Sequence, residues 1–174
     1  RGSGQIGGEA IADDNFFNEF NKPPEPRLLT RIPPIDRWIG GITRGTVMGI
    51  LSPYKGRKTS LMLNMVLNLV ESGASVSVLM FESTQEFVKC QIASQLAMRW
   101  LIRNRVYASA DDHGLPMYVG LSAKDIFDAN NQYQSWHPTR RNALQDAFNR
   151  MRAFENRIRI YSTGHKTGKL SDLA

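Results

Sequence analysis

Ser52-Pro-Tyr-Lys-Gly-Arg-Lys58-Thr59-Ser60 is the most informative segment of this 174-residue chain. It follows a short apolar run at 46–51 and precedes a long apolar stretch at 61–70 with the pattern of a helix. In a strand–loop–helix unit whose loop ends in Lys-Thr, backbone N–H groups and the helix N-terminus hold phosphate oxygens. The lysine reaches the outer phosphates, and the threonine hydroxyl binds Mg²⁺. The stretch therefore predicts a phosphate-binding loop.

The loop departs from the pattern G-x-x-x-x-G-K-[ST] at both glycine positions, which are Ser52 and Arg57 here. Ser52 is a mild change, because a small residue leaves the backbone accessible. Arg57 is harder, because a residue with a Cβ costs about 1–2 kcal/mol at positive φ, and we expect Gly56 to absorb part of this strain. Lys55 and Arg57 add positive charge that favours a triphosphate. We expect the loop to bind nucleotide; the alternative is that Arg57 fills the phosphate pocket and the loop is structural.

Composition favours one globular domain, because 41% of the residues are hydrophobic. No apolar run reaches the roughly 18 residues that cross a bilayer, and the start of the chain has no apolar signal-peptide core. The single cysteine, Cys90, excludes an internal disulfide framework, and its apolar setting favours a buried thiol over a nucleophile. The net charge of +6 is compatible with polyanion partners but does not establish them. We expect a cytoplasmic protein without a membrane partner.

The chain divides into a tail and a globular part. Residues 1–28 are expected to form a flexible tail, a short linker helix and a proline-rich linker, with the helix packing either on its own domain or on a neighbouring subunit. Residues 29–174 form the predicted domain, which ends in the start of a further helix at 169–174. Its strands are expected at 46–51, 75–81 and 157–161, and its helices at 32–41, 59–72, 85–107 and 138–154. Strands that alternate with helices predict a parallel α/β sheet.

A carboxylate, Glu82, ends the second expected strand. In one large class of P-loop ATPases, such a carboxylate on a neighbouring strand orients the attacking water, which phosphoryl transfer requires besides charge neutralisation. The alternative is that Glu82 caps the next helix near its positive end. Spacing alone leaves both interpretations open.

Arg31-Ile-Pro-Pro-Ile-Asp36-Arg-Trp-Ile-Gly40-Gly41-Ile-Thr-Arg-Gly45 is similar to the pattern G-x-P-x-L-D-x-x-x-G-G-x-x-x-G. This pattern precedes the first core strand in the RecA-like motor domain of DnaB-family replicative helicases, which the chain resembles in three stretches. Val78-Leu-Met-Phe-Glu82-Ser-Thr-Gln-Glu86 is similar to the family's strand ending in Glu-Met-Ser, whose glutamate is catalytic. A helix followed by Ile158-Arg-Ile-Tyr-Ser-Thr-Gly164 is similar to the segment before the family's Walker B strand. The resemblance is closest to phage-type members and covers the predicted domain.

The resemblance implies an α/β fold with a RecA-like P-loop core, a mostly parallel sheet flanked by helices. This core would be incomplete at its C-terminus, because the family's Walker B aspartate, sensor, DNA loops and arginine finger lie further on. The implied cofactors are ATP and Mg²⁺, with Lys58 on the β- and γ-phosphates, Thr59 on Mg²⁺ and Glu82 polarising water. The implied nucleotide-binding residues are Ser52, Pro53, Tyr54, Lys55, Gly56, Arg57, Lys58, Thr59 and Ser60.

The implied partners are single-stranded DNA, a homo-hexameric ring and a primase or helicase loader, in the host cytoplasm if the protein is phage-encoded. We expect this portion alone not to hydrolyse ATP at a useful rate. Two other interpretations stay open: a catalytically inactive RecA-like assembly or loading module, and a recombinase-type ATPase.

Other candidates carry weaker signals. His113, His137 and His165 share no metal-ligand spacing. The arginines at 99, 103 and 105 are expected to form a solvated basic face, with a DNA or subunit contact as the alternative. The aromatic residues at 133 and 136 are expected to cover an apolar surface, with base stacking as the alternative.

Overall fold

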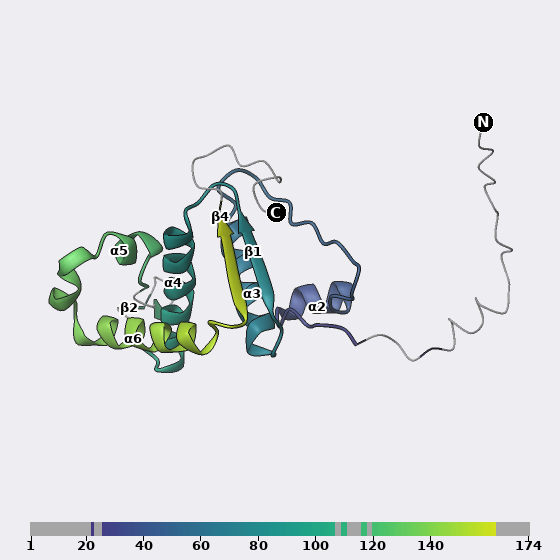
Figure 1. The fold of residues 1–174 in the computed structure, drawn as a ribbon. Helices are drawn as coiled ribbons and strands as arrows, with labels where there is room; N and C mark the ends of the chain where they lie inside the picture. Colours follow the sequence, from purple (N-terminus) through teal and green to yellow (C-terminus); the bar gives the residue numbers. More distant parts are fainter. Residues whose placement is uncertain (1–21, 23–25, 107–108, 111–115, 118–119, 163–174) are drawn as a thin grey trace, which may run out of the picture.

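The computed structural model describes residues 22, 26–106, 109–110, 116–117 and 120–162 of the chain (Figure 1). The expected linker helix before residue 21 and the expected start of a helix at 169–174 lie outside this part. The elements, in chain order, are α2 (Pro33–Ile39), α3 (Lys58–Glu71), β1 (Val76–Met80), α4 (Gln85–Arg103), β2 (Ser109–Ala110), β3 (Pro116–Met117), α5 (Ala123–Phe127), the 3-10 helix η1 (Asn130–Ser135), α6 (Pro138–Ala153) and β4 (Ile158–Ser162).

A two-stranded parallel sheet stands at the centre, with β1 and β4 paired in register from Val76↔Ile158 to Met80↔Ser162. Helix α3 lies behind it in Figure 1 and covers the face on which Val78 and Met80 are buried. On the opposite face, Leu79 and its register partner on β4, Tyr161, are 38% and 40% exposed. The predicted parallel α/β arrangement is thus confirmed in general form, with one parallel strand pair and one covered face in the part described; β2 and β3 form a separate, antiparallel pair.

Helix α4 is the centre of the hydrophobic core. Its buried residues recur every four or five positions, at Val88, Ile92, Leu96 and Leu101, the spacing that keeps one face of a helix in the core. Helices α3, α5 and α6 and strand β4 pack against it. The predicted helices over 59–72 and 138–154 and the strands over 75–81 and 157–161 are confirmed within a residue or two, whereas the helix predicted over 85–107 ends at Arg103.

The strand expected at 46–51 is wrong, because these residues have no regular secondary structure. Val47 and Leu51 are 100% and 97% exposed, and among the described residues the backbone of 47–51 makes no hydrogen bond to other backbone groups. A strand is stable only when a neighbour takes its N–H and C=O groups. Here β4 pairs with one edge of β1, and no described strand pairs with the other. Residues 46–51 therefore run as an extended connection on the far side of β1 from β4 (Figure 1).

The short helix expected at 32–41 is confirmed as α2, and glycines end it as predicted. Gly40 caps it with φ 69° and donates to Asp36 O, a left-handed conformation that favours glycine. Gly41 has φ 95°, and a Cβ there would lie 3.2 Å from the Leu28 carbonyl oxygen. Because Leu28 and Ile42 exchange backbone hydrogen bonds, the glycine pair turns the chain back onto its own start.

Candidate functional site

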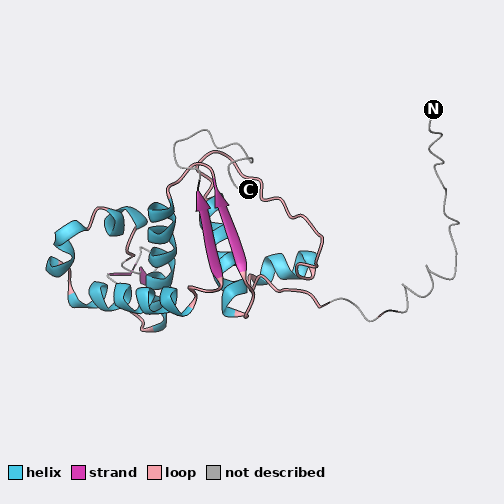
Figure 2. Cartoon of the chain, in the orientation of Figure 1, coloured by secondary structure: helices cyan, strands magenta, loops and turns pink. Residues whose placement is uncertain are grey.

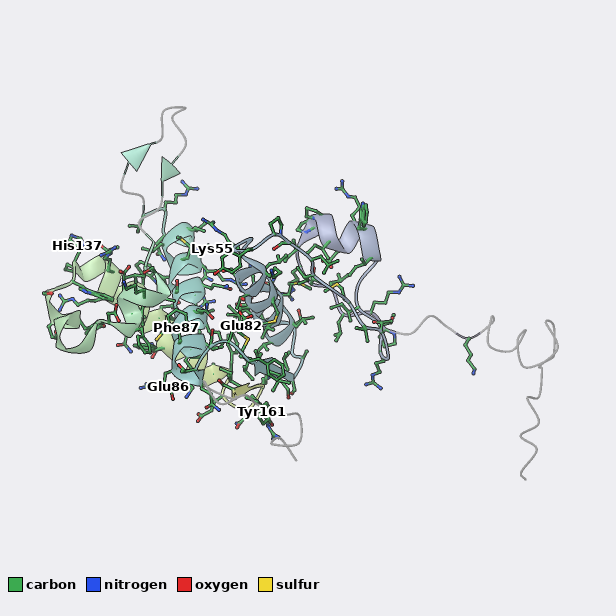
Figure 3. All side chains as sticks on the ribbon, turned by 90° about the horizontal axis from the view of Figure 1, so that it is seen from above. Lys55, Glu82, Glu86, Phe87, His137 and Tyr161 are labelled. Atoms are coloured by element: carbon green, nitrogen blue, oxygen red, sulfur yellow. The ribbon has the colours of Figure 1, made fainter. Side chains whose placement is uncertain are left out.

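The loop at 52–57 lies at the end of the sheet where both strands finish. The connection from α2 arches over the carboxyl ends of β1 and β4 before α3 begins (Figure 2). Figure 3 looks onto this end of the molecule and labels Lys55 and Glu82. In open α/β sheets, this end of the strands is where ligands usually bind.

The loop is closed by bonds within itself. The Gly56 N–H donates to the Pro53 carbonyl at 3.0 Å. Lys58 Nζ donates to the carbonyl oxygen of Ser52 at 3.2 Å. The side chain expected to reach phosphate is thereby held over the loop that it belongs to.

Two loop residues adopt left-handed backbone conformations, Lys55 with φ 59° and Arg57 with φ 57°. Arg57 thus carries the positive φ itself, as the sequence-based cost assumes, and Gly56 does not have one. Gly56 is required for another reason. A Cβ there would lie 2.2 Å from Ser52 Oγ and 2.8 Å from the Pro53 carbonyl oxygen, so there is no room for a side chain.

Arg57 is the N-cap of α3, and its side chain makes no capping hydrogen bond. The N–H groups of the first turn, Lys58 to Ser60, thus have no side-chain acceptor from the cap, and the positive end of the helix dipole lies beside them. Alternation of left-handed and other residues just before such a turn makes a concavity that suits anions. The loop backbone and the start of α3 can therefore hold phosphate oxygens.

A hollow of about 310 Å³ lies beside the loop. Lys58 and Thr59 of α3 border it, together with Met80 at the end of β1; Met62, Met48 and Ile50 complete its lining. Because Glu82 comes two residues after Met80 in the sequence, the hollow brings the Lys-Thr pair and the end of β1 to one place. Arg57 borders a different hollow, of about 530 Å³, toward α4 and α5.

Glu82 is exposed and lies two residues beyond the end of β1, after Phe81. The alternative that it caps the next helix is wrong, because the N-cap of α4 is Thr84, whose side chain accepts from Phe87 N at 3.3 Å. Ser162 Oγ at the end of β4 donates to the Ser83 carbonyl and ties the residue after Glu82 to the second strand. Glu82 is thus free of a capping role and held at the carboxyl end of the sheet.

The aromatic residue of the loop, Tyr54, is 89% exposed. Lys55 Nζ lies 5.6 Å from its ring centroid, within the range of a cation–π contact. The loop thus presents a flat aromatic surface and several cations to solvent at the same end of the molecule.

Sequence reasoning did not find the polar contacts that anchor α3. Thr30 is completely buried and donates from its N–H and its hydroxyl to Asp36 Oδ1, both at 2.8 Å. Its carbonyl accepts from Asn68 Nδ2 at 2.7 Å. Partial desolvation pushes the pKa of Asp36 up, but the hydrogen bonds from Thr30 and from the backbone of the next two residues together bring it below its usual value. The two asparagines in an otherwise apolar helix were the available signal.

Arg99 is not part of a solvated basic face, since it pairs with Glu71 at 3.0 Å. Tyr133 and Trp136 pack edge to face, 5.8 Å between centroids, against the core, so the covering role is confirmed. His137 is the N-cap of α6, and its Nδ1 accepts from Thr139 N at 3.4 Å; the other two histidines lie outside the described part.

No group of three or more histidine, cysteine and acidic side chains that could hold a metal ion occurs in the described ranges. Cys90 is half-buried, not fully buried as expected, and desolvation and then the charge of Glu86 raise the pKa of its thiol, which disfavours a nucleophile. None of the described helices combines the length and apolar content needed to cross a bilayer. Comparison with known proteins gives no match for this chain, whether among protein-family models, curated proteins or solved structures.

Proposed function

We propose that the loop at 52–57 and the start of α3 bind a nucleoside triphosphate with Mg²⁺. One observation carries the proposal: left-handed Lys55 and Arg57 lead into an uncapped helix N-terminus, with Lys58 held over the loop by the Ser52 carbonyl. This combination offers backbone donors, a helix dipole and several cations to one anion. A neutral ligand would not need this accumulation of positive charge.

The residues at hand fit such a ligand. Lys58 would neutralise the outer phosphates once it leaves the Ser52 carbonyl. Thr59 is half-buried beside it and would supply the hydroxyl oxygen for Mg²⁺, which keeps most of its ligands from water and phosphate. Glu82 stands exposed where β1 ends and would accept a hydrogen bond from a water near the terminal phosphate.

The wider proposal follows the resemblance. We infer that the chain carries a RecA-like ATPase core of the DnaB helicase type, working on single-stranded DNA in a hexameric ring. The order of the Asp36–Gly41 segment, the phosphate loop and Glu82 along the sequence supports it. Within the portion described, we expect nucleotide binding without efficient turnover.

A second function, a non-enzymatic assembly or loading module, is favoured by a separate observation. The connection before the loop forms no strand, and its Val47 and Leu51 are fully exposed. A phosphate loop without a strand beneath its first residue is less rigidly placed, and exposed apolar side chains suit a contact with another protein.

Equilibrium binding of a fluorescent ATP analogue in the presence of Mg²⁺ separates the two functions. We expect wild-type protein to bind, Lys58→Ala to lose at least about tenfold in affinity, because a charge-assisted contact to phosphate is removed, and Lys89→Ala to bind like wild type. Lys89 is the matched control, because it is an exposed lysine of α4 on the side facing α6 and β4. Equal and poor binding by wild type and Lys58→Ala would rule out the nucleotide site.

A further inference from the structure

A ladder of polar contacts joins α3 to α4. Three α3 residues four positions apart, Ser60, Asn64 and Asn68, face Gln95 and Arg99, which are four apart on α4. We call these five residues the polar ladder. Such spacing places each set in one stripe along its helix, so the two stripes meet along the length of the contact.

Each rung is made by a side chain of α4. Gln95 Nε2 donates to the Ser60 carbonyl at 2.8 Å, within the first turn of α3. Arg99 Nη2 donates to the side-chain oxygens of both asparagines, at 2.7 Å for Asn68. The other Arg99 nitrogen, Nη1, pairs with Glu71 Oε2 at 3.0 Å. The guanidinium of Arg99 therefore contacts three residues that lie on successive turns of α3.

Two further polar contacts join α3 to other parts of the chain. Asn68 donates to the carbonyl of buried Thr30, so its amide bridges the segment before α2 and α4. Glu71 also approaches Arg150 of α6 at 3.7 Å. The position of α3 is thus fixed by polar contacts to three other parts of the chain.

Apolar packing alone fixes that position poorly. Apart from the ladder, the middle of α3 is a run of leucine, methionine and valine, and a helix that is apolar nearly all round buries similar area when it rotates or slides. Among the ladder residues Asn68 alone is buried, and its amide is satisfied only where it meets both the Thr30 carbonyl and Arg99. The contacts of Gln95 with Ser60 and of Arg99 with Asn64 are exposed to water and add to the same register. The ladder is therefore suited to select one register.

We propose that Gln95 and Arg99 are positioning residues that fix the register of α3 against α4. This register sets the separation between the Lys58–Thr59 pair at the start of α3 and Glu82, which lies just before α4. The effect on the separation between Lys58 and Glu82 rests on the proposed nucleotide site, whereas the register role of Gln95 and Arg99 does not. A slide of one helical turn, about 5.4 Å, would remove the lysine from any phosphate that Glu82 can serve.

The register is measured without ligand. Nitroxide labels at Ser72, exposed at the end of α3, and Lys89, exposed on α4, report the distance between the helices in a Cys90→Ser background. We expect a narrow distance distribution that broadens or shifts in Arg99→Met. Arg99→Lys should restore part of the narrow distance distribution, because a lysine ammonium can keep the ion pair with Glu71 but cannot also donate to both asparagines.

The matched control is Arg103→Met. Arg103 lies one turn further along α4 and is exposed, so the change in charge and helix propensity is the same, but no ladder contact is lost. If Arg99→Met does not fold, Gln95→Met removes the Ser60 contact alone and takes its place. A distribution in the folded variant that matches wild type, or equal broadening in Arg103→Met, overturns the register role.

The link to the site is read from nucleotide affinities. In Arg99→Met we expect affinity for the ATP analogue to fall about tenfold and affinity for ADP to fall less, because ADP lacks the γ-phosphate that Lys58 and Glu82 would share and keeps only the β-phosphate contact. A general loss of stability would lower both alike, and that outcome overturns the link. If wild-type protein binds neither nucleotide, the proposed function fails, and the distance measurement still decides the register role.

Discussion

Replacing Arg57 by glycine and by alanine tests how the loop tolerates an arginine at a glycine position. Arg57 has φ 57°, and a residue with a Cβ costs about 1–2 kcal/mol in this conformation. Glycine removes that strain but raises the entropy of the unfolded chain by about 0.4–1 kcal/mol. Glycine is also a better N-cap than alanine. Arg57→Gly should therefore be more stable than Arg57→Ala by about 1 kcal/mol.

Urea unfolding of the three proteins measures this difference directly. We expect Arg57→Gly to match or exceed wild type in free energy of unfolding and Arg57→Ala to show no gain, because alanine keeps the Cβ. If Arg57→Ala is the more stable of the two variants, the left-handed conformation does not exist in solution, and the account of the loop fails.

The same two variants decide what the arginine does for a ligand. If its charge assists the triphosphate, both variants bind the ATP analogue more weakly than wild type, and the loss diminishes as salt is raised. If the side chain instead fills the phosphate site, both bind more tightly. The placement of Arg57 on the α4 side of the loop favours the first result.

Three further predictions concern Gly56 in the loop, Asp36 on α2 and Cys90 on α4. Gly56→Ala should lower the free energy of unfolding by about 1–3 kcal/mol and weaken nucleotide binding, because the new Cβ would meet Ser52 Oγ. In urea unfolding, the double variant with Ser52→Gly should recover part of this loss. If it recovers nothing, the clash is refuted. The pKa of Asp36 in the folded protein lies below its usual 3.8. The ionised carboxylate therefore stabilises the fold above pH 3.8, and this contribution is lost as the pH falls through the lowered pKa. The urea midpoints of wild type and Asp36→Asn should converge below the lowered pKa, and a constant difference between them would contradict this. The thiol of Cys90, whose pKa is raised by burial and by Glu86, should react with iodoacetamide at pH 8 more slowly in folded than in urea-unfolded protein, and Glu86→Gln should speed the folded reaction.

The helices and the two paired strands could be predicted because their signals are local. The buried face of α4 can be read from Val88, Ile92 and Leu96 alone, and a threonine cap precedes it. The expected strand at 46–51 failed because a strand depends on a partner that the local sequence does not contain. Its apolar side chains give the same pattern whether paired or exposed.

Two features of the site had signals that were not used. Asn64 and Asn68 in an apolar helix indicate polar partners, but nothing in the sequence shows that Arg99 supplies them from α4. The helix α5 was missed in the stretch 108–137, although Ser122 and Asp125 form the capping box that begins it. The partner of the two asparagines depends on tertiary packing, whereas the start of α5 could have been predicted from the local sequence.

The pairing of β1 with β4 has a consequence for the order in which the chain folds. Helices α4, α5 and α6 all lie between these two strands in the sequence, and α5 and α6 both pack on α4, so they can form a unit from contacts of modest chain separation. The strand pair must wait for that unit, because closing a long loop costs entropy that only the finished contact returns. We expect the carboxyl end of the sheet, with Glu82 and the loop beside it, to assemble last and to open first in hydrogen exchange.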